Sequence, residues 1–130
     1  MKNNYNIDDY ISDATALENK DHIEVMKRLS SESMIRMLHA SMGMVTEAGE
    51  LADMLKKHIF YGKEVDKTNA IEEAGDVLWY LAVLLDTLGV SFEEVMEKNI
   101  AKLRARYPDK FTKDDAINRD LKVEREILEK

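Results

Sequence analysis

Two short acidic motifs hold the residues of this sequence whose types and spacing are best suited to chemistry. The first, EAGEL, spans residues 47–51, and the second, EAGDV, spans residues 73–77. In each motif two acids lie three residues apart, so on a helix they project from one face about one turn apart. Two such pairs on neighbouring helices would bring four carboxylates together, those of Glu47, Glu50, Glu73 and Asp76.

An isolated pair of acids on a helix has a simpler explanation, which is a solvated surface. Here the motif recurs, and both copies lie among apolar and small residues. No Lys or Arg stands four residues after any of these acids, where a helix-surface ion pair would form. Carboxylates without such partners on a mostly apolar helix are costly unless a cation compensates their charge. The pattern therefore favours a metal site.

Four carboxylates would supply hard oxygen ligands, which suit Mg²⁺, with Mn²⁺ as a substitute, rather than a soft metal. Mg²⁺ in proteins commonly keeps several waters and contacts substrate phosphates. The site is therefore expected to serve phosphoryl chemistry rather than to hold a structural ion.

The composition limits the classes of protein to which this chain can belong. Of its 130 residues, 45% are hydrophobic and 35% are charged, which is typical of a globular protein and not of a disordered one. The formal net charge of -7 argues against nucleic acid as a partner, because phosphate backbones are bound by clustered Lys and Arg. The absence of Cys excludes disulfides and thiolate metal sites.

Neither a signal peptide nor a membrane span is expected from the sequence. The N-terminal stretch contains no apolar segment of signal-peptide length. The longest apolar run, residues 77–85, is too short to cross a bilayer. We therefore expect a cytoplasmic protein with no membrane partner.

The elements that would position the acids are long helices. One Pro and five Gly leave few helix breakers, and no strand-like alternation occurs. We predict an all-α fold, a bundle of four or five helices, as a single domain over residues 1–130. The helical core is expected at about residues 32–108, followed by a helical arm at about 112–130. The predicted helices cover residues 7–17, with a further turn or two at 21–29, then about 32–60, 66–88 and 91–107.

Local signals mark the end of the first acid-bearing helix and the start of the second. Gly62 is the predicted left-handed cap that ends the first helix. Asp66, Thr68 or Asn69 is expected to cap the second. Asn69 together with Glu72 also resembles a capping box.

Several features bear on how these helices pack. The stretch 77–85 is apolar nearly all round, which predicts burial inside the monomer or at a subunit interface. Gly49 and Gly75 lie between the acids of their motifs, and we predict that their missing side chains let the two helices share metal at close approach. The arm has few apolar residues and is expected to pack on a partner subunit or to fray. Arg104 and Arg106 are expected to be solvated or in ion pairs.

The acid pattern resembles the ExxE…ExxD signature of the MazG-like superfamily of all-α nucleoside triphosphate pyrophosphohydrolases. The resemblance extends to EAGDVLWYL at residues 73–81 and to NIAKLRARYP at residues 99–108, and it covers roughly residues 34–111. The first motif of this family often starts with two adjacent acids, whereas Thr46 stands at the first of those positions here. This departure leaves the number of metal ions open.

The resemblance implies Mg²⁺-dependent cleavage of (d)NTP between the α and β phosphates, giving (d)NMP and pyrophosphate in nucleotide-pool housekeeping. It implies a homodimer or homotetramer, because family members build their base pocket across subunits. One glutamate, for example Glu47, would orient or deprotonate the attacking water. By the same resemblance, the catalytic metal ligands would be Glu47, Glu50, Glu73 and Asp76.

Other residues are candidates for substrate binding, each with a structural alternative. Tyr80 would touch a ribose or base, or serve as a core tyrosine. Asn99 and Lys102 resemble the NxxK segment of the family, and Lys102 would bind a phosphate or remain a surface lysine. Lys56, near the end of its helix, would border the site or pair with the helix dipole. His39 would line a base pocket or be an ordinary helix histidine.

Two other functions remain open at this level. A non-catalytic helical protein could bind a metal, a nucleotide or partner helices without turnover, although such a protein has no need of the complete acid quartet. A phosphoribosyl-ATP pyrophosphohydrolase-like enzyme would use the same fold for a different substrate, but the length and flanks fit it less well.

Overall fold

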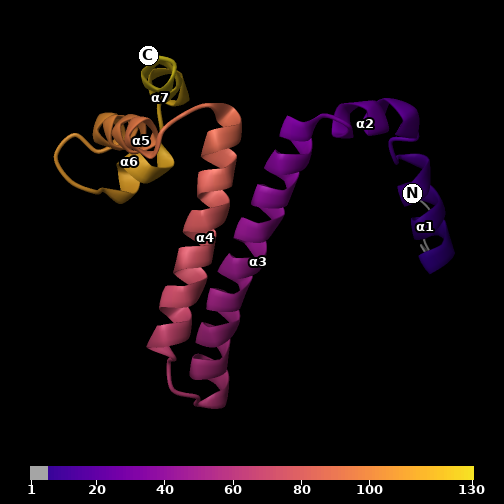
Figure 1. Ribbon diagram of the computed structural model, residues 1–130, viewed down its shortest axis with the longest axis horizontal. Coiled ribbons are helices and arrows are strands. Elements are labelled where there is room, and N and C mark those ends of the chain that lie inside the picture. Colours follow the sequence, from indigo (N-terminus) through magenta and orange to yellow (C-terminus); the bar gives the residue numbers. More distant parts are fainter. Residues whose placement is uncertain (1–5) are drawn as a thin grey trace. The chain divides into compact units, whose positions relative to one another are not determined.

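The computed structural model describes residues 6–130, and this part of the chain contains helices and no strand (Figure 1). The all-α prediction is therefore confirmed. The chain divides into two compact units, one ending at Ile35 and the other running from Arg36 to Lys130. The helices of the described residues are α1 (Ile7–Ala16), α2 (His22–Leu29), α3 (Glu32–Tyr61), α4 (Lys67–Leu88), α5 (Phe92–Arg106), α6 (Lys113–Ile117) and α7 (Leu121–Leu128).

The first unit contains two short helices, each with a side-chain cap, and the first turn of α3. The Asn6 side chain accepts a hydrogen bond from the Asp9 backbone N–H at 2.9 Å, which caps α1. Asp21 does the same for α2 by accepting from the Glu24 N–H at 3.2 Å. The helix predicted at residues 7–17 and the extra turns at 21–29 are therefore separate helices.

In the second unit, α3 and α4 form an antiparallel pair of long helices joined by a short loop (Figure 1). Gly62 ends α3 with a φ of 68°, as predicted, and its N–H donates to the His58 carbonyl. Of the three predicted caps for α4, Asp66 is the one used, because its carboxylate accepts from the backbone N–H groups of Thr68 and Asn69. The bounds of α3 and α4 agree with the prediction to within a residue or two.

The ring of Tyr80 on α4 packs directly against Gly43 of α3. A Cβ atom placed on Gly43 would lie 2.2 to 2.4 Å from ring atoms of Tyr80, so only glycine permits this contact. Near the C-terminal end of α4, the Arg36 guanidinium donates a hydrogen bond to the Asp86 carboxylate at 2.5 Å. The role predicted for Gly49 and Gly75 is wrong, because a Cβ at either position would meet no described atom within 4 Å.

The last helix, α7, packs on α5 of the same chain through a buried charged cluster. Glu124 of α7 is only 5% exposed and accepts from Arg106 of α5 at 2.9 and 2.6 Å. Arg119 donates to the same carboxylate at 3.2 and 2.7 Å. The prediction that the arm packs on a partner or frays is therefore wrong, whereas the ion pair expected for Arg106 is confirmed.

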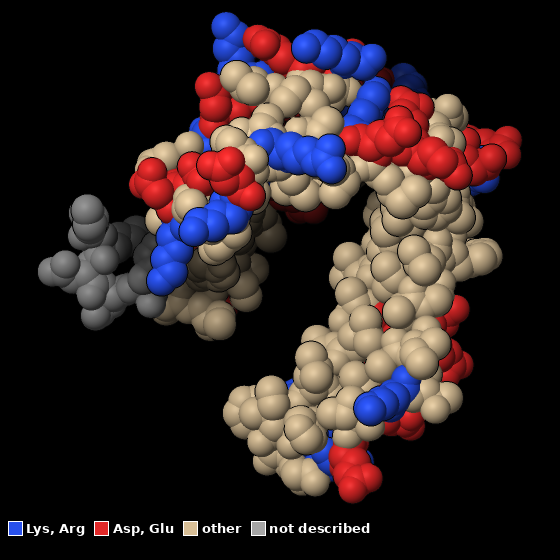
Figure 2. All heavy atoms as spheres, turned by 90° about the vertical axis from the view of Figure 1, so that its left-hand side faces the viewer, with Lys and Arg blue, Asp and Glu red and all other residues tan. Residues whose placement is uncertain are grey.

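Much of the apolar surface of the α3–α4 pair faces solvent in the single chain. Leu78 and Trp79 of α4 are both 56% exposed, and within α4 only Glu73 and Leu85 are buried. The residues 77–85 are thus not enclosed within the monomer. Figure 2 shows a largely uncharged face along this helix pair, while charged side chains gather on the C-terminal helices above it.

Among the described residues, no single helix is long and apolar enough to cross a membrane. The pair α4 and α5 meets the length and composition together, but a 96° bend separates the two helices.

Candidate functional site

Three of the four predicted acids meet between α3 and α4. Glu47 comes from α3, and Glu73 and Asp76 come from α4, where a spacing of three places them on one face. One carboxylate oxygen from each residue lies within 4.8 Å of the other two. We call these three residues the acid trio. The acid trio thus contains both acids of the second motif and the first acid of the first motif.

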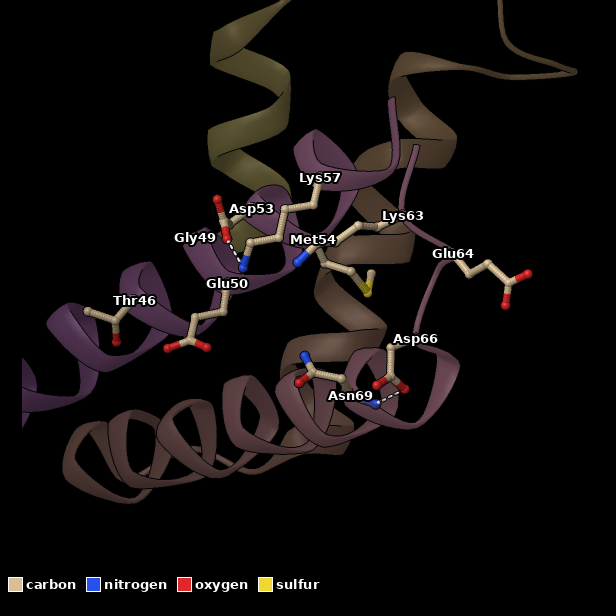
Figure 3. Close-up of a pocket in the computed structure, with 10 residues that line it drawn as sticks. All are labelled: Thr46, Gly49, Glu50, Asp53, Met54, Lys57, Lys63, Glu64, Asp66 and Asn69. Carbon is tan, nitrogen blue, oxygen red and sulfur yellow. Dashed lines mark hydrogen bonds and ion pairs between the residues drawn. The ribbon is translucent and has the colours of Figure 1, made fainter. Parts of the chain in front are cut away.

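Glu50, the fourth predicted acid, lies beside the acid trio rather than in it. Its side chain lines the neighbouring cleft (Figure 3). Its negative charge still reaches Glu73 and is one of the causes that raise the pKa of Glu73.

The electrostatics of the acid trio centre on Glu73, which is only 6% exposed. Burial raises the pKa of Glu73 most strongly, and the negative charges of Glu50 and Glu47 raise it further. A hydrogen bond from the Asn69 amide Nδ2 to Glu73 Oε1, at 2.9 Å, acts in the opposite direction and lowers this pKa. The ionised form of Glu73 is thus under-compensated by the chain itself.

The donor set of the acid trio fits a hard divalent cation. All three ligand atoms are carboxylate oxygens, which Mg²⁺ and Mn²⁺ prefer. Opposite oxygens around octahedral Mg²⁺ are separated by about 4.2 Å, since each bond is about 2.1 Å. The three oxygens of the acid trio lie within 4.8 Å of one another, so small side-chain movements would bring them to such distances. A cation would also compensate the charge that burial makes unfavourable at Glu73.

A cleft of about 690 Å³ opens beside the acid trio. Its volume is typical of sites that bind small molecules. Figure 3 shows side chains from α3, from the loop after it and from the first turn of α4 around this space. The residues that line the cleft are Thr46, Gly49, Glu50, Asp53, Met54, Lys57, Lys63, Glu64, Asp66 and Asn69.

Asp53 lines the cleft but was missed by the sequence argument. Lys56 and Lys57 both form ion pairs with it, Lys57 at 2.6 Å, and these lower the pKa of Asp53 to about 2. The lysine at the fourth following position is the feature that marks an ordinary helix-surface pair. Because Lys57 follows Asp53 by four residues, the criterion of an acid without a lysine at that spacing did not identify Asp53. Lys56, a predicted substrate ligand, is engaged by Asp53 in this structure.

Asn69 was also missed as a site residue, because a polar residue at a helix start is usually a cap. The predicted capping box with Glu72 does not form. Asp66 caps the helix instead, and the side chain of Asn69 donates to Glu73 one turn further on. The spacing of four residues between a side-chain amide and an acid is the signal that could have found this contact.

The position at which the family often has an additional acid is occupied by Thr46. Its hydroxyl donates to the Gly43 carbonyl of the same helix at 2.8 Å. Thr46 borders the cleft, but it has no carboxylate to replace the missing ligand.

Tyr80 and His39, two predicted substrate-binding residues, contact each other across α3 and α4. Their rings lie edge to face, with centroids 5.6 Å apart. Tyr80 also packs on Gly43 and meets Trp79 edge-on at 4.8 Å. Trp79 itself is 56% exposed and so lies outside the core of this chain. The structure supports an aromatic contact between the helices; base binding by Tyr80 or His39 stays a prediction.

Asn99 and Lys102 lie on α5, and neither lines the cleft. Asn99 borders a separate hollow of about 340 Å³, which it shares with Leu128 of α7. Lys102 is half-buried on α5. Their contact with substrate stays a prediction.

Comparison with known proteins places these observations in a family. The profile of the MazG nucleotide pyrophosphohydrolase domain matches residues 36–111, which is more than half of the chain. The chain belongs to this family. The match contains the acid trio, the cleft and α5, and it leaves out α1, α2, α6 and α7. A nucleotide pyrophosphohydrolase-type enzyme is therefore supported at the level of the family, which generally uses divalent metals.

Two relatives show what this member of the MazG family is similar to. The Gene 37 protein of Mycobacterium phage L5 is 35% identical over 80 residues, which cover 58% of this chain and 69% of the phage protein. The uncharacterized protein YvdC of Bacillus subtilis (strain 168) is 36% identical over 73 residues, which cover 49% of this chain and 69% of that protein. No solved structure gave a significant match.

Proposed function

We propose that this chain is a Mg²⁺-dependent nucleoside triphosphate pyrophosphohydrolase. It would cleave (d)NTP between the α and β phosphates to (d)NMP and pyrophosphate, as part of nucleotide-pool housekeeping. The observation that carries this proposal is the acid trio, three carboxylates from two helices beside a cleft large enough for a nucleotide. The family to which the chain belongs points in the same direction.

Glu47, Glu73 and Asp76 would hold the cation, and Mn²⁺ would substitute for Mg²⁺. When bound, the cation supplies neutralisation of phosphate charge and polarisation of a phosphoryl oxygen. The two motifs present their carboxylates from facing helices, so the proposed ligands would already be close together before substrate enters. This preorganisation reduces the reorganisation that the site must undergo during the reaction.

Glu50 is the carboxylate best placed to handle the attacking water. It lies in the cleft beside the acid trio, and it is not one of the three converging ligands. Glu50 would orient the water and accept its proton as the oxygen attacks the α-phosphorus. The bond from the α-phosphorus to the bridging oxygen then breaks, and pyrophosphate leaves with the electron pair. Glu50 would thus take the water-activating role first suggested for Glu47, because Glu47 is one of the three proposed cation ligands.

The lysines of the cleft fit the polyphosphate end of the substrate. Lys57 and Lys63 both line the cleft and would meet phosphate oxygens as point charges. Lys57 is held by Asp53 at 2.6 Å, so its ammonium group stays at the cleft before substrate binds. The exposed position of this pair makes its contribution sensitive to salt.

A homodimer or homotetramer is part of the proposal. Leu78 and Trp79 are large apolar side chains that remain 56% exposed on α4. A second copy of the chain would cover this surface, and would close the base pocket near Tyr80 and His39. The oligomeric state can be measured by light scattering.

The test is a panel of canonical and modified (d)NTPs, with phosphoribosyl-ATP included, incubated with Mg²⁺. Pyrophosphate and the nucleoside monophosphate are both quantified, with EDTA as the metal-free control. The proposal predicts equal amounts of the two products from at least one nucleoside triphosphate, and none with EDTA. Cleavage of phosphoribosyl-ATP alone would reassign the substrate. Nucleotide binding without product would support a non-catalytic binding protein and contradict the proposal.

A further inference from the structure

We infer that Asn69 is a positioning residue for the metal site and acts through Glu73. This inference rests on the proposed function, because it assigns a role to a neighbour of a proposed metal ligand. Asn69 lies in the first turn of α4 and borders the cleft. Its Nδ2 donates to Glu73 Oε1 at 2.9 Å.

The backbone of Asn69 is held in place by the cap of α4. Asp66 Oδ1 accepts from the Thr68 N–H at 3.0 Å and from the Asn69 N–H at 3.1 Å. The Asp66 carbonyl accepts in turn from the Ala70 N–H at 3.0 Å. Asn69 is therefore fixed at the helix start, and Glu73 follows four residues later on the same face. A rigid helical turn thus sets the position from which the amide reaches the carboxylate.

A neutral donor suits the environment of Glu73. The carboxylate is almost fully buried and lies near the negative charges of Glu47 and Glu50. An amide can fix one oxygen of the carboxylate while leaving the group its negative charge and free lone pairs for a cation. A lysine in the same place would neutralise the carboxylate and compete with the cation.

Asp53, on the neighbouring helix α3, is a carboxylate with the opposite kind of partner. Lys56 and Lys57 both pair with it, and its charge is already compensated by the chain. Glu73 has an amide where Asp53 has two ammonium groups. A neutral amide partner leaves the charge of Glu73 available to a cation, whereas the two lysines neutralise the charge of Asp53. Outer partners of metal ligands typically change metal affinity by about 10- to 100-fold.

The experiment compares Mn²⁺ affinity of the full chain and of Asn69→Leu, which keeps the approximate shape of the side chain and removes the donor. Asn69→Ala is the second variant, and Thr68→Ala is the matched control in the same helical turn. Mn²⁺ binding is followed by electron paramagnetic resonance. We expect both Asn69 variants to bind Mn²⁺ about 10- to 100-fold more weakly, with Thr68→Ala unchanged.

A second readout uses the metal-free protein and separates positioning from helix stability. If Asn69 acts through Glu73, the effects of Asn69→Leu and Glu73→Gln on the melting temperature should not add. Circular dichroism should show the same helical content in all variants. Additive effects, or loss of helical content in Asn69→Leu alone, would assign Asn69 to helix stability and overturn the inference.

The outcomes for Asn69 and for the proposed function are distinguishable. Mn²⁺ affinity of Asn69→Leu within about twofold of the natural chain would overturn the positioning role, whatever the activity. Weaker Mn²⁺ binding in the Asn69 variants, combined with no cleavage of any nucleotide by the natural chain, would support the positioning role and contradict the proposed function. Absence of Mn²⁺ binding in the natural chain would overturn both.

Discussion

Two glutamates of this chain are almost equally buried and have opposite surroundings. Glu124 is 5% exposed and lies between two arginines, which hold its pKa down to about 2. Glu73 is 6% exposed and lies near two other carboxylates, so that its pKa is raised. Arg119 and Arg106 supply charge-assisted hydrogen bonds to Glu124, whereas Glu73 receives one from a neutral amide.

The difference separates a carboxylate that the chain itself neutralises from one for which we propose a functional role. A buried charge is unfavourable unless it is paired and hydrogen-bonded. At Glu124 the chain provides the partners, and the result is a fixed contact between α7 and α5. At Glu73 the chain assembles further acids instead, and under the proposed function a bound cation supplies the compensating charge. This is the physical reason for placing a cation at the acid trio.

The largest expected effect concerns the unpaired acids. Asp76→Asn removes a ligand of the acid trio and should lower pyrophosphate release by at least about 100-fold, the upper range for even an outer partner of a ligand. Asp53→Asn is the matched control, because Asp53 lines the cleft but is paired with two lysines. It should lower activity much less. The comparison fails if both variants lose activity equally, as measured by steady-state release at saturating Mg²⁺.

The next largest expected effect is the loss of thermal stability when Glu124 is changed. Glu124→Gln leaves Arg106 and Arg119 without their carboxylate and should lower the melting temperature by several degrees. Glu126→Gln, an exposed acid on the same helix, should leave it nearly unchanged. Thermal unfolding followed by circular dichroism measures both. Folded Glu124→Gln should still bind Mn²⁺, and loss of binding without loss of stability would contradict the division into two roles.

The same contact predicts a dependence of stability on pH. The pKa of Glu124 is lowered from 4.5 to about 2 in the folded chain. A lowered pKa means that ionised Glu124 stabilises the fold above its unfolded pKa, and that this contribution is lost as the pH falls from about 5 towards 2. The melting temperatures of the natural chain and Glu124→Gln should therefore converge on acidification. A constant difference across this range would rule out the ion pairs as its cause.

The smallest expected effect is a stabilisation. Glu73→Gln removes a buried charge from the acid trio and should raise the melting temperature of the metal-free chain slightly, since it relieves repulsion. The same variant should lose the rise in melting temperature that Mg²⁺ gives to the natural chain. Differential scanning calorimetry with and without Mg²⁺ measures the metal-free melting temperature and its rise with Mg²⁺. A metal-free Glu73→Gln that melts well below the natural chain would show that Glu73 is structural.

The contrast also explains which parts of the molecule could be predicted from sequence. Helix bounds followed from local signals, such as Gly62 after α3 and Ser91 before α5, whose hydroxyl accepts from the Glu94 N–H. The acids Glu73 and Asp76 followed from spacing and from the absence of a nearby lysine. These features depend on residues within one or two helical turns of each other.

Contacts between distant residues could not be predicted in the same way. The pair of Arg106 and Glu124 bridges 18 positions and two helix breaks. Periodicity also gives the apolar stripe of a helix but not the point at which it crosses its neighbour. The contact of Gly43 with the Tyr80 ring could therefore not be told in advance from the predicted contacts of Gly49 and Gly75, which have no such neighbour.

The most direct test of the account is the position of a bound cation. Crystals of the chain grown with Mn²⁺ would locate the ion by its anomalous scattering. We predict a peak at about 2.2 Å from carboxylate oxygens of Glu47, Glu73 and Asp76, within the range of hard-cation bonds. A peak beside Asp53 only, or well-ordered trio carboxylates with no peak at saturating Mn²⁺, would contradict the account.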